Sequence, residues 1–418
     1  MIIFKKKAIF TALCASLVTS MATAEQVELT IASFPNFNKA AEAAAPLFEK
    51  QYPNIKLKFV NMAYSDHHNA MTTAMATGAN LPDVMGVEAN FIGRFAESGG
   101  LEQLNAAPYN AGEFTQKIVP FTLGQATDSD GALRAMPADI GPGALFYRKD
   151  VLEIAGVTEE ELIKDWDSFI QAGVKVKAKT GNYLIANATD IKNIYIRSEL
   201  KEGEGIYFDK EHNILVNTPR FKEAFRLSKV ARDAGIDGKI SPWTNEWTEG
   251  LKRGTISVQM MGAWLGGHLQ DWIAPDDAGK WRSADLPNGS FASWGGSFFA
   301  IPAKAEHKAE AWEFIKFMST NKEVQLLAFK EINAFPSLIE AQTCPMFDEE
   351  IAYLGGQKAR LQWKKAALKI PFVAMDCYDE VARQIVDDAL EQVLEHDADI
   401  DKVLADAEKQ IKRRARRR

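Results

Sequence analysis

Segments with strand-type and helix-type patterns alternate through the first part of the chain, and this alternation constrains the fold more than any other feature. Apolar and polar residues alternate over 27–31 and again over 55–59, which predicts two strands. Between them, apolar residues recur at steps of three and four from 40 to 48, which predicts a helix. A further helix ends at Gly78, and an apolar strand follows at 84–87. Such alternation predicts an α/β fold with a largely parallel sheet.

The same kind of pattern continues after residue 137, where a second unit begins. We expect strands at 145–147, 255–261 and 298–301, and helices at 166–170, 311–318 and 381–394. A chain of 418 residues exceeds one ordinary hydrophobic core, so two domains are predicted. Because no low-complexity linker separates them, we expect the chain to cross more than once between two lobes that a hinge joins.

The first 24 residues have the pattern of an export signal. Three lysines at 5–7 precede an apolar run from 8 to 20, and small residues occupy 22–24 just before Glu25. This run is too short for a membrane helix, and no later apolar stretch approaches the roughly 20 residues that one requires. We therefore expect a signal peptide at 1–24 and a mature chain in the periplasm.

Charge and cysteine content narrow the possible partners. Removal of the signal takes away three lysines and no acidic residue, which changes the formal net charge from −7 to −10. An acidic chain is a poor candidate for nucleic-acid binding. Cys344 and Cys377 remain after cleavage, and they either form a disulfide or stay as two buried thiols. Because no cysteines and histidines have zinc-site spacing, we expect no metal and no cofactor.

A search for catalytic motifs gives a negative result. The sequence contains no GxSxG, no HExxH, no P-loop and no GxGxxG after a strand. We therefore predict that the protein is not an enzyme. A dispersed catalytic triad or a pair of glycosidase carboxylates would escape such a search, so a secreted carbohydrate-active enzyme remains the alternative from another functional class.

Tryptophans are concentrated in one part of the chain and indicate the kind of ligand. Six of the nine lie between residues 243 and 294. Flat indole rings stack on the apolar faces of pyranose rings, and polar neighbours bind the hydroxyl groups. Trp264 follows the predicted strand 255–261, at the carboxyl end where open α/β sheets bind ligands. Gly295 and Gly296 precede another strand, and they either let the backbone approach a ligand or form a plain turn.

Several short segments, taken together and in order, match a known family. They are 48–55 (FEKQYPNI), 81–84 (LPDV), 145–150 (LFYRKD), 262–264 (GAW) and 295–302 (GGSFFAIP). The chain resembles the extracellular solute-binding proteins of family 1, the sugar-binding components of ABC transporters, a family that includes maltose-binding protein. The likeness covers nearly all of the chain after the signal.

This resemblance implies a two-lobed periplasmic-binding-protein fold of type II. The N-terminal lobe would comprise 25–136 and 292–338, and the C-terminal lobe 137–291 and 339–418. A sugar or oligosaccharide would bind in the cleft between the lobes, and the loaded protein would deliver it to the ABC permease in the inner membrane. The resemblance further implies a monomer that binds its ligand without chemical change.

The resemblance also implies which residues contact the ligand. The first lobe and the crossing segments would contribute Asn36, Phe37, Glu88, Asn90, Asp139, Gly295 and Gly296. The second lobe would contribute Tyr195, Trp243, Trp247, Trp264 and Tyr378.

The chain departs from maltose binders at two positions. It has Val87 where they carry an aromatic residue, and Gly141 where they carry a carboxylate, although Asp139 is two positions away. These differences bear on maltose itself and not on the family. A polyol or a glycerophosphodiester is the alternative solute, and a phosphorylated ligand would call for an arginine or helix N-terminal amides in the cleft.

Overall fold

The computed structural model describes residues 26–201 and 203–415. The predicted signal peptide at 1–24 therefore lies outside the described residues. The strands are β1 Val27–Ser33, β2 Ile55–Asn61, β3 Val84–Glu88, β4 Met136–Arg148, β5 Val258–Gly262, β6 Trp281–Ala284, β7 Ser293–Ala300 and β8 Phe335–Pro336. The α-helices are α1 Phe37–Gln51, α2 Tyr64–Thr77, α3 Ala89–Ala96, α4 Pro120–Gln125, α5 Lys149–Ala155, α6 Glu159–Ile163, α7 Trp166–Thr180, α8 Thr189–Ser198, α9 Pro219–Asp233, α10 Asn245–Arg253, α11 Leu265–His268, α12 Lys308–Thr320, α13 Lys322–Ile332, α14 Ala359–Ala367, α15 Asp379–His396 and α16 Ile400–Ala415. A π-helix, η3 Leu269–Ile273, continues directly from α11.

The strands follow the order β2-β1-β3-β7-β4-β5, and β6 and β8 also pair with β4. Among the described strands, β1 pairs in parallel with β2 and β3, whereas the pairs made by β7 and β4 are antiparallel. The prediction of a largely parallel sheet was therefore wrong. Parallel pairing follows from strand–helix–strand crossovers within one lobe, but β4 leaves the first lobe and β7 returns to it, so these two strands must run in opposite directions.

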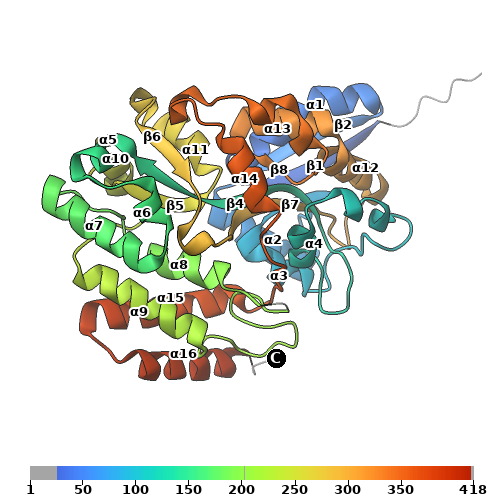
Figure 1. Ribbon diagram of the computed structural model, residues 1–418. Coiled ribbons are helices and arrows are strands. Elements are labelled where there is room, and N and C mark those ends of the chain that lie inside the picture. The colour runs from blue at the N-terminus through green and yellow to red at the C-terminus, as the bar shows by residue number, and fades with distance from the viewer. Residues whose placement is uncertain (1–25, 202, 416–418) are drawn as a thin grey trace, which may run out of the picture.

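Strand β4 belongs to both halves of the molecule. Its residues 136–142 pair with β7, while residues 143–148 pair with β5 and β6. Twelve of its thirteen residues are buried, which is the pattern of a strand covered on both faces. In Figure 1, β4 and β7 lie at the centre, between the blue N-terminal elements on one side and the green and yellow elements on the other.

The buried apolar residues form separate cores on the two sides of this crossing. One core draws on residues 29–138 and 298–341, and it includes the stacked pair Phe37–Phe299, whose ring centroids are 4.7 Å apart. Two further cores draw on residues 145–292 and 188–411. A fourth cluster, with members from 119 to 370, lies around the crossing and connects them. The fold thus consists of two α/β lobes, as predicted.

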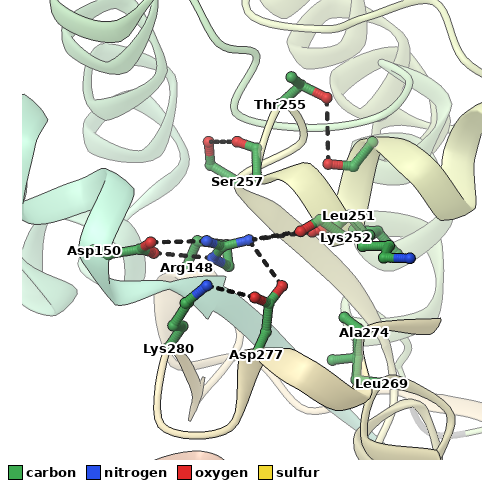
Figure 2. A network of polar contacts seen from close by, with 12 residues as sticks. Arg148, Asp150, Leu251, Lys252, Thr255, Ser257, Leu269, Ala274, Asp277 and Lys280 are labelled. Atoms are coloured by element: carbon green, nitrogen blue, oxygen red, sulfur yellow. Dashed lines mark hydrogen bonds and ion pairs between the residues drawn. The ribbon is translucent and has the colours of Figure 1, made fainter. Parts of the chain in front are cut away.

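A buried arginine fixes the far end of β4. Arg148, the last residue of the strand, is 5% exposed, and its guanidinium donates to both carboxylate oxygens of Asp150 at 2.7 and 2.9 Å. It also donates to the Lys252 carbonyl at 3.1 Å and to Asp277 at 3.2 Å, and Lys280 completes the network (Figure 2). These bonds tie β4 to the end of α10, which fixes the position of the long strand on which the crossing depends.

Two further predictions concern cysteines and membrane helices. Cys344 and Cys377 are not bridged to one another and both are half-buried, so the structure shows neither the disulfide nor two fully buried thiols. Within residues 26–201 and 203–415, no helix is both long enough and apolar enough to cross a membrane.

Candidate ligand-binding site

Trp264 lies where the two lobes meet, because the chain turns sharply after β5. The strand ends at Gly262, and the indole of Trp264 folds back so that its Nε1 donates to the Trp294 carbonyl at 2.8 Å. A Cβ on Gly262 would lie 2.2 Å from that nitrogen, and a Cβ on Gly295 would lie 3.0 Å from it. Two glycines from different strands therefore provide the space that the indole occupies.

The backbone at the start of β7 requires glycine. Gly295 has φ +81° and Gly296 has φ +113°, and side-chain-bearing residues rarely adopt such values. On the paired strand, a Cβ on Gly141 would lie 1.9 Å from the Trp294 carbonyl oxygen. No side chain fits at 141, so the position where maltose binders carry a carboxylate is occupied here by the β7 backbone.

Glu88 brings a carboxylate from the first lobe to the glycines at the start of β7. It ends β3 and caps α3, and its Oε2 accepts hydrogen bonds from the Asn90 amide at 2.9 Å and from the Tyr64 hydroxyl at 2.7 Å. Its Oε1 lies 3.9 Å from where a Cβ on Gly295 would stand. Burial raises the pKa of Glu88, and the hydrogen bonds and the nearby Arg197 charge oppose this rise. Glu88 and Trp264 thus approach the same glycine.

Asp139 supplies a second carboxylate, from the crossing strand β4. It pairs with Ser297 of β7, and no hydrogen-bond partner reaches its buried Oδ1 among the described residues. Burial raises the pKa of Asp139 to about 6, although hydrogen bonds from Ser297 favour the charged form. A buried acceptor without a donor is costly, so a donor that reached this atom would stabilise the folded protein.

Trp243 and Trp247, which the sequence did not distinguish, have different positions. Trp243 is 54% exposed and stacks on Trp264, with ring centroids 5.8 Å apart and planes at 22°. Trp247 is fully buried, and its Nε1 donates to Gln259 at 2.8 Å. This corrects the expectation for Trp247, because a side chain without exposed surface supports Trp243 from beneath and presents no face to a ligand.

Among the remaining predicted residues of the first lobe, some are exposed and one is buried in the core. Asn36 and Asn90 are exposed, Asn36 just before α1 and Asn90 beside Glu88. Phe37 is 4% exposed and packs on Phe34 and Phe299, so it belongs to the core and not to the surface of the site.

Tyr195 and Tyr378 make their contacts away from Trp264, Glu88 and Gly295. Tyr195 packs against Trp166, and the Tyr378 hydroxyl donates to the Ala415 carbonyl at the end of α16. Arg197 lies two residues after Tyr195 in α8, on the opposite side of the helix. Its guanidinium is 4.8 Å from the centre of the Trp294 ring, and the side chain is 8% exposed. Sequence reasoning missed Arg197 because a single arginine in an amphipathic helix carries no distinguishing pattern.

Two α/β lobes that share crossing strands, with glycines, indoles and carboxylates gathered at the crossing, define a two-lobed binding protein for a small solute. The comparison with protein families agrees with this class. The chain belongs to the bacterial extracellular solute-binding proteins, and a sequence model of this family matches residues 43–353. The family predicted from the sequence is therefore confirmed.

Individual relatives extend the comparison. The chain is similar to the lactose-binding protein of Rhizobium radiobacter, with 26% identity over 384 residues that cover 88% of each chain. A crystal structure of an extracellular solute-binding protein of family 1 has a TM-score of 0.82 at 24% identity and covers 93% of this chain and 99% of that one. An ABC-transporter-associated binding protein from B. animalis subsp. lactis Bl-04, in complex with β-1,6-galactobiose, has a TM-score of 0.74 at 23% identity and covers 93% and 97%. The two structures confirm the predicted fold.

Proposed function

We propose that this protein captures a sugar or oligosaccharide between its lobes and delivers it to the permease of an ABC importer. The observation that carries the proposal is the meeting of Trp264, Glu88 and Gly295 at the point where β4 and β7 cross. An indole face with a carboxylate beside it suits a pyranose, which has an apolar face and hydroxyls at its edge. The lactose-binding relative supports a sugar as the ligand.

The proposed mechanism is capture without chemical change. Trp264 and Trp243 offer indole faces, Glu88 and Asp139 accept hydrogen bonds from hydroxyls, and Arg197 donates them. Ligand binding would favour a closed arrangement of the lobes to the extent that the ligand binds the closed form more tightly. The lobe boundaries that we propose are those expected from the sequence, 25–136 with 292–338 and 137–291 with 339–418.

The proposal extends to location and assembly. We propose that residues 1–24 are a signal peptide, that the mature protein is a periplasmic monomer, and that its partner is the inner-membrane permease. Membership of an extracellular family supports the exported state.

The test is a binding screen on the mature chain. Mono-, di- and trisaccharides, polyols and glycerol phosphates are screened by thermal shift and tryptophan fluorescence, and each hit is recovered and analysed chemically. A sugar at about 100 times its dissociation constant is expected to stabilise the protein by about 2.7 kcal/mol. Trp264→Ala is expected to weaken binding at least about tenfold because it removes the stacking face. Ile154→Ala, at a 70% exposed position on α5, is the matched control.

The other outcomes separate the alternatives. Consumption of the sugar would support a carbohydrate-active enzyme instead of a binding protein. A hit confined to polyols or to glycerol phosphates would replace the sugar with one of those solutes. No binding by any member of the panel, with a folded protein, would contradict the proposal.

A further inference from the structure

We infer that the aromatic surface continues beyond Trp264 and forms an outer subsite at Trp272, so that the ligand contains at least two sugar rings. The inference rests on the proposed function and narrows it to a class of saccharide. We call the four rings of Trp243, Trp264, His268 and Trp272 the aromatic platform. Neither His268 nor Trp272 was singled out as a contact residue from the sequence.

The rings of the platform form a continuous series. From Trp264 to His268 the ring centroids are 5.5 Å apart, and from His268 to Trp272 they are 5.8 Å apart. Trp243 lies 5.8 Å from both Trp264 and His268. The His268 ring stands edge-on to both neighbours, at 79° to Trp264 and at 79° to Trp272, so the two indoles are separate faces on either side of the histidine, and one pyranose ring does not cover both.

Trp272 is exposed and yet held in place. The side chain is 50% exposed, and its Nε1 donates to His268 Nδ1 at 2.8 Å. It lies in the π-helix η3, a type of helix that is rare and occurs frequently at functional sites. A fixed, half-exposed indole is expected to bind a ring with little loss of side-chain freedom.

The same hydrogen bond determines the state of His268. Because Nδ1 accepts from the indole, the proton of the neutral ring is on Nε2, which can donate to a hydroxyl. Burial lowers the pKa of His268, the negative charge of Asp271 opposes this, and the positive charge of Lys39 adds to it. Lys39 lies in the first turn of α1, three residues after Asn36, so a charge of the first lobe acts on His268.

Trp243 shows a second sign of a binding surface. Its φ of +68° is unusual for a bulky aromatic residue, and strained residues of this kind cluster at functional sites. In this backbone conformation the indole lies over Trp264 with about half of its surface exposed, and the buried Trp247 lies against it.

The test is a chain-length series measured by isothermal titration calorimetry. The probes are galactose with lactose, and glucose with maltose and maltotriose. The expected result, for the series that binds, is a dissociation constant at least about tenfold lower for the disaccharide than for its monosaccharide. Trp272→Ala is expected to remove most of this gain and to change monosaccharide binding less than about twofold. Trp272→Phe, which keeps a flat ring, should retain part of the gain, and Ile154→Ala should retain all of it.

Two results would overturn the inference while the proposed function stands. One is a monosaccharide that binds as tightly as the longer sugars of its series. The other is a Trp272→Ala protein that keeps the full gain with chain length, which would assign Trp272 to a surface other than the sugar site. Failure of every saccharide to bind the folded wild-type protein would instead contradict the proposed function, and the inference with it.

Discussion

Buried carboxylates without a full set of partners are the main feature of the site at the scale of single residues. Asp139 lies on the crossing strand β4, and its Oδ1 lacks a donor among the described residues. Burial disfavours the charged form of this carboxyl and raises its pKa to about 6. A ligand hydroxyl that donates to Oδ1 would lower the cost, which couples binding to stability.

Asp139→Asn tests this account through the pH dependence of stability. Burial raises the pKa of Asp139 from 3.8 to about 6, so the folded protein binds a proton that the unfolded chain has already lost between these values. The free energy of unfolding should therefore fall as pH rises from about 4 to about 6, by up to about 3 kcal/mol from this group. Above pH 6 the asparagine variant is expected to be the more stable protein, and its ligand affinity the lower one.

Urea unfolding at pH 4, 5, 6 and 7 measures this effect. The exposed Asp276→Asn, which removes a carboxylate elsewhere, is the control. Equal changes in unfolding free energy across this pH range for wild type and Asp139→Asn would show that Asp139 is not the group responsible.

The antiparallel pair β4–β7 is the element that creates the site. Where the two strands pass between the lobes they pair with register shifts between Pro137 and Asp139 and again between Ile140 and Pro142. At these irregularities the strand backbones approach closely, and Gly141 meets the Trp294 carbonyl without room for a methyl group. The same carbonyl accepts the hydrogen bond from Trp264, so strand packing and indole position depend on one another.

Gly141→Ala is expected to disrupt both the packing of β4 on β7 and the position of the Trp264 indole. The added methyl would lie 1.9 Å from a backbone oxygen that no rotamer change can move, and the protein should lose about 3 kcal/mol of stability. Displacement of the Trp294 carbonyl should also weaken sugar binding. Gly112→Ala is the matched control, because a Cβ there meets nothing within 4 Å. A Gly141→Ala protein as stable as Gly112→Ala would contradict the close approach of the strands.

At the scale of the whole molecule, residues 368–378, between α14 and α15, pack against both lobes. A Cβ on Gly93 of α3 would lie 2.8 Å from the Asp376 carbonyl oxygen, and one on Gly124 of α4 would lie 2.0 Å from the Phe372 ring. On the other side, His212 and Asp376 are 2.7 Å apart. The segment is therefore packed between helices of the first lobe and a loop of the second. A movement of the lobes would change these contacts.

Lobe movement is tested by small-angle X-ray scattering. A saturating sugar is expected to reduce the radius of gyration, because ligand that contacts both lobes favours their closed arrangement. Trp264→Ala at the same sugar concentration should show a smaller reduction, because less of it is bound. An unchanged radius of gyration in wild-type protein with sugar bound would show that the lobes do not move on binding.

Local patterns in the sequence were sufficient for most elements. The alternating strand at 27–31, the helix that ends at Gly78 and the strand that leads to Trp264 all occur, although β5 begins at Val258 and not at residue 255. These features depend on side-chain periodicity and on backbone angles, which neighbouring residues determine. The requirement for glycine at 295 and 296 is of the same local kind.

Other features were decided by residues far apart in the chain. Trp243 and Trp247 are four residues apart, yet one is exposed and the other is bonded to Gln259 in the core. Arg197 reaches Trp294 only because α8 packs near the crossing, and β4 and β7 are antiparallel because the chain must leave one lobe and return. The sequence alone determined which elements form and which family the chain belongs to. The tertiary structure decided which aromatic faces remain exposed, because exposure depends on what the rest of the chain packs against each side chain.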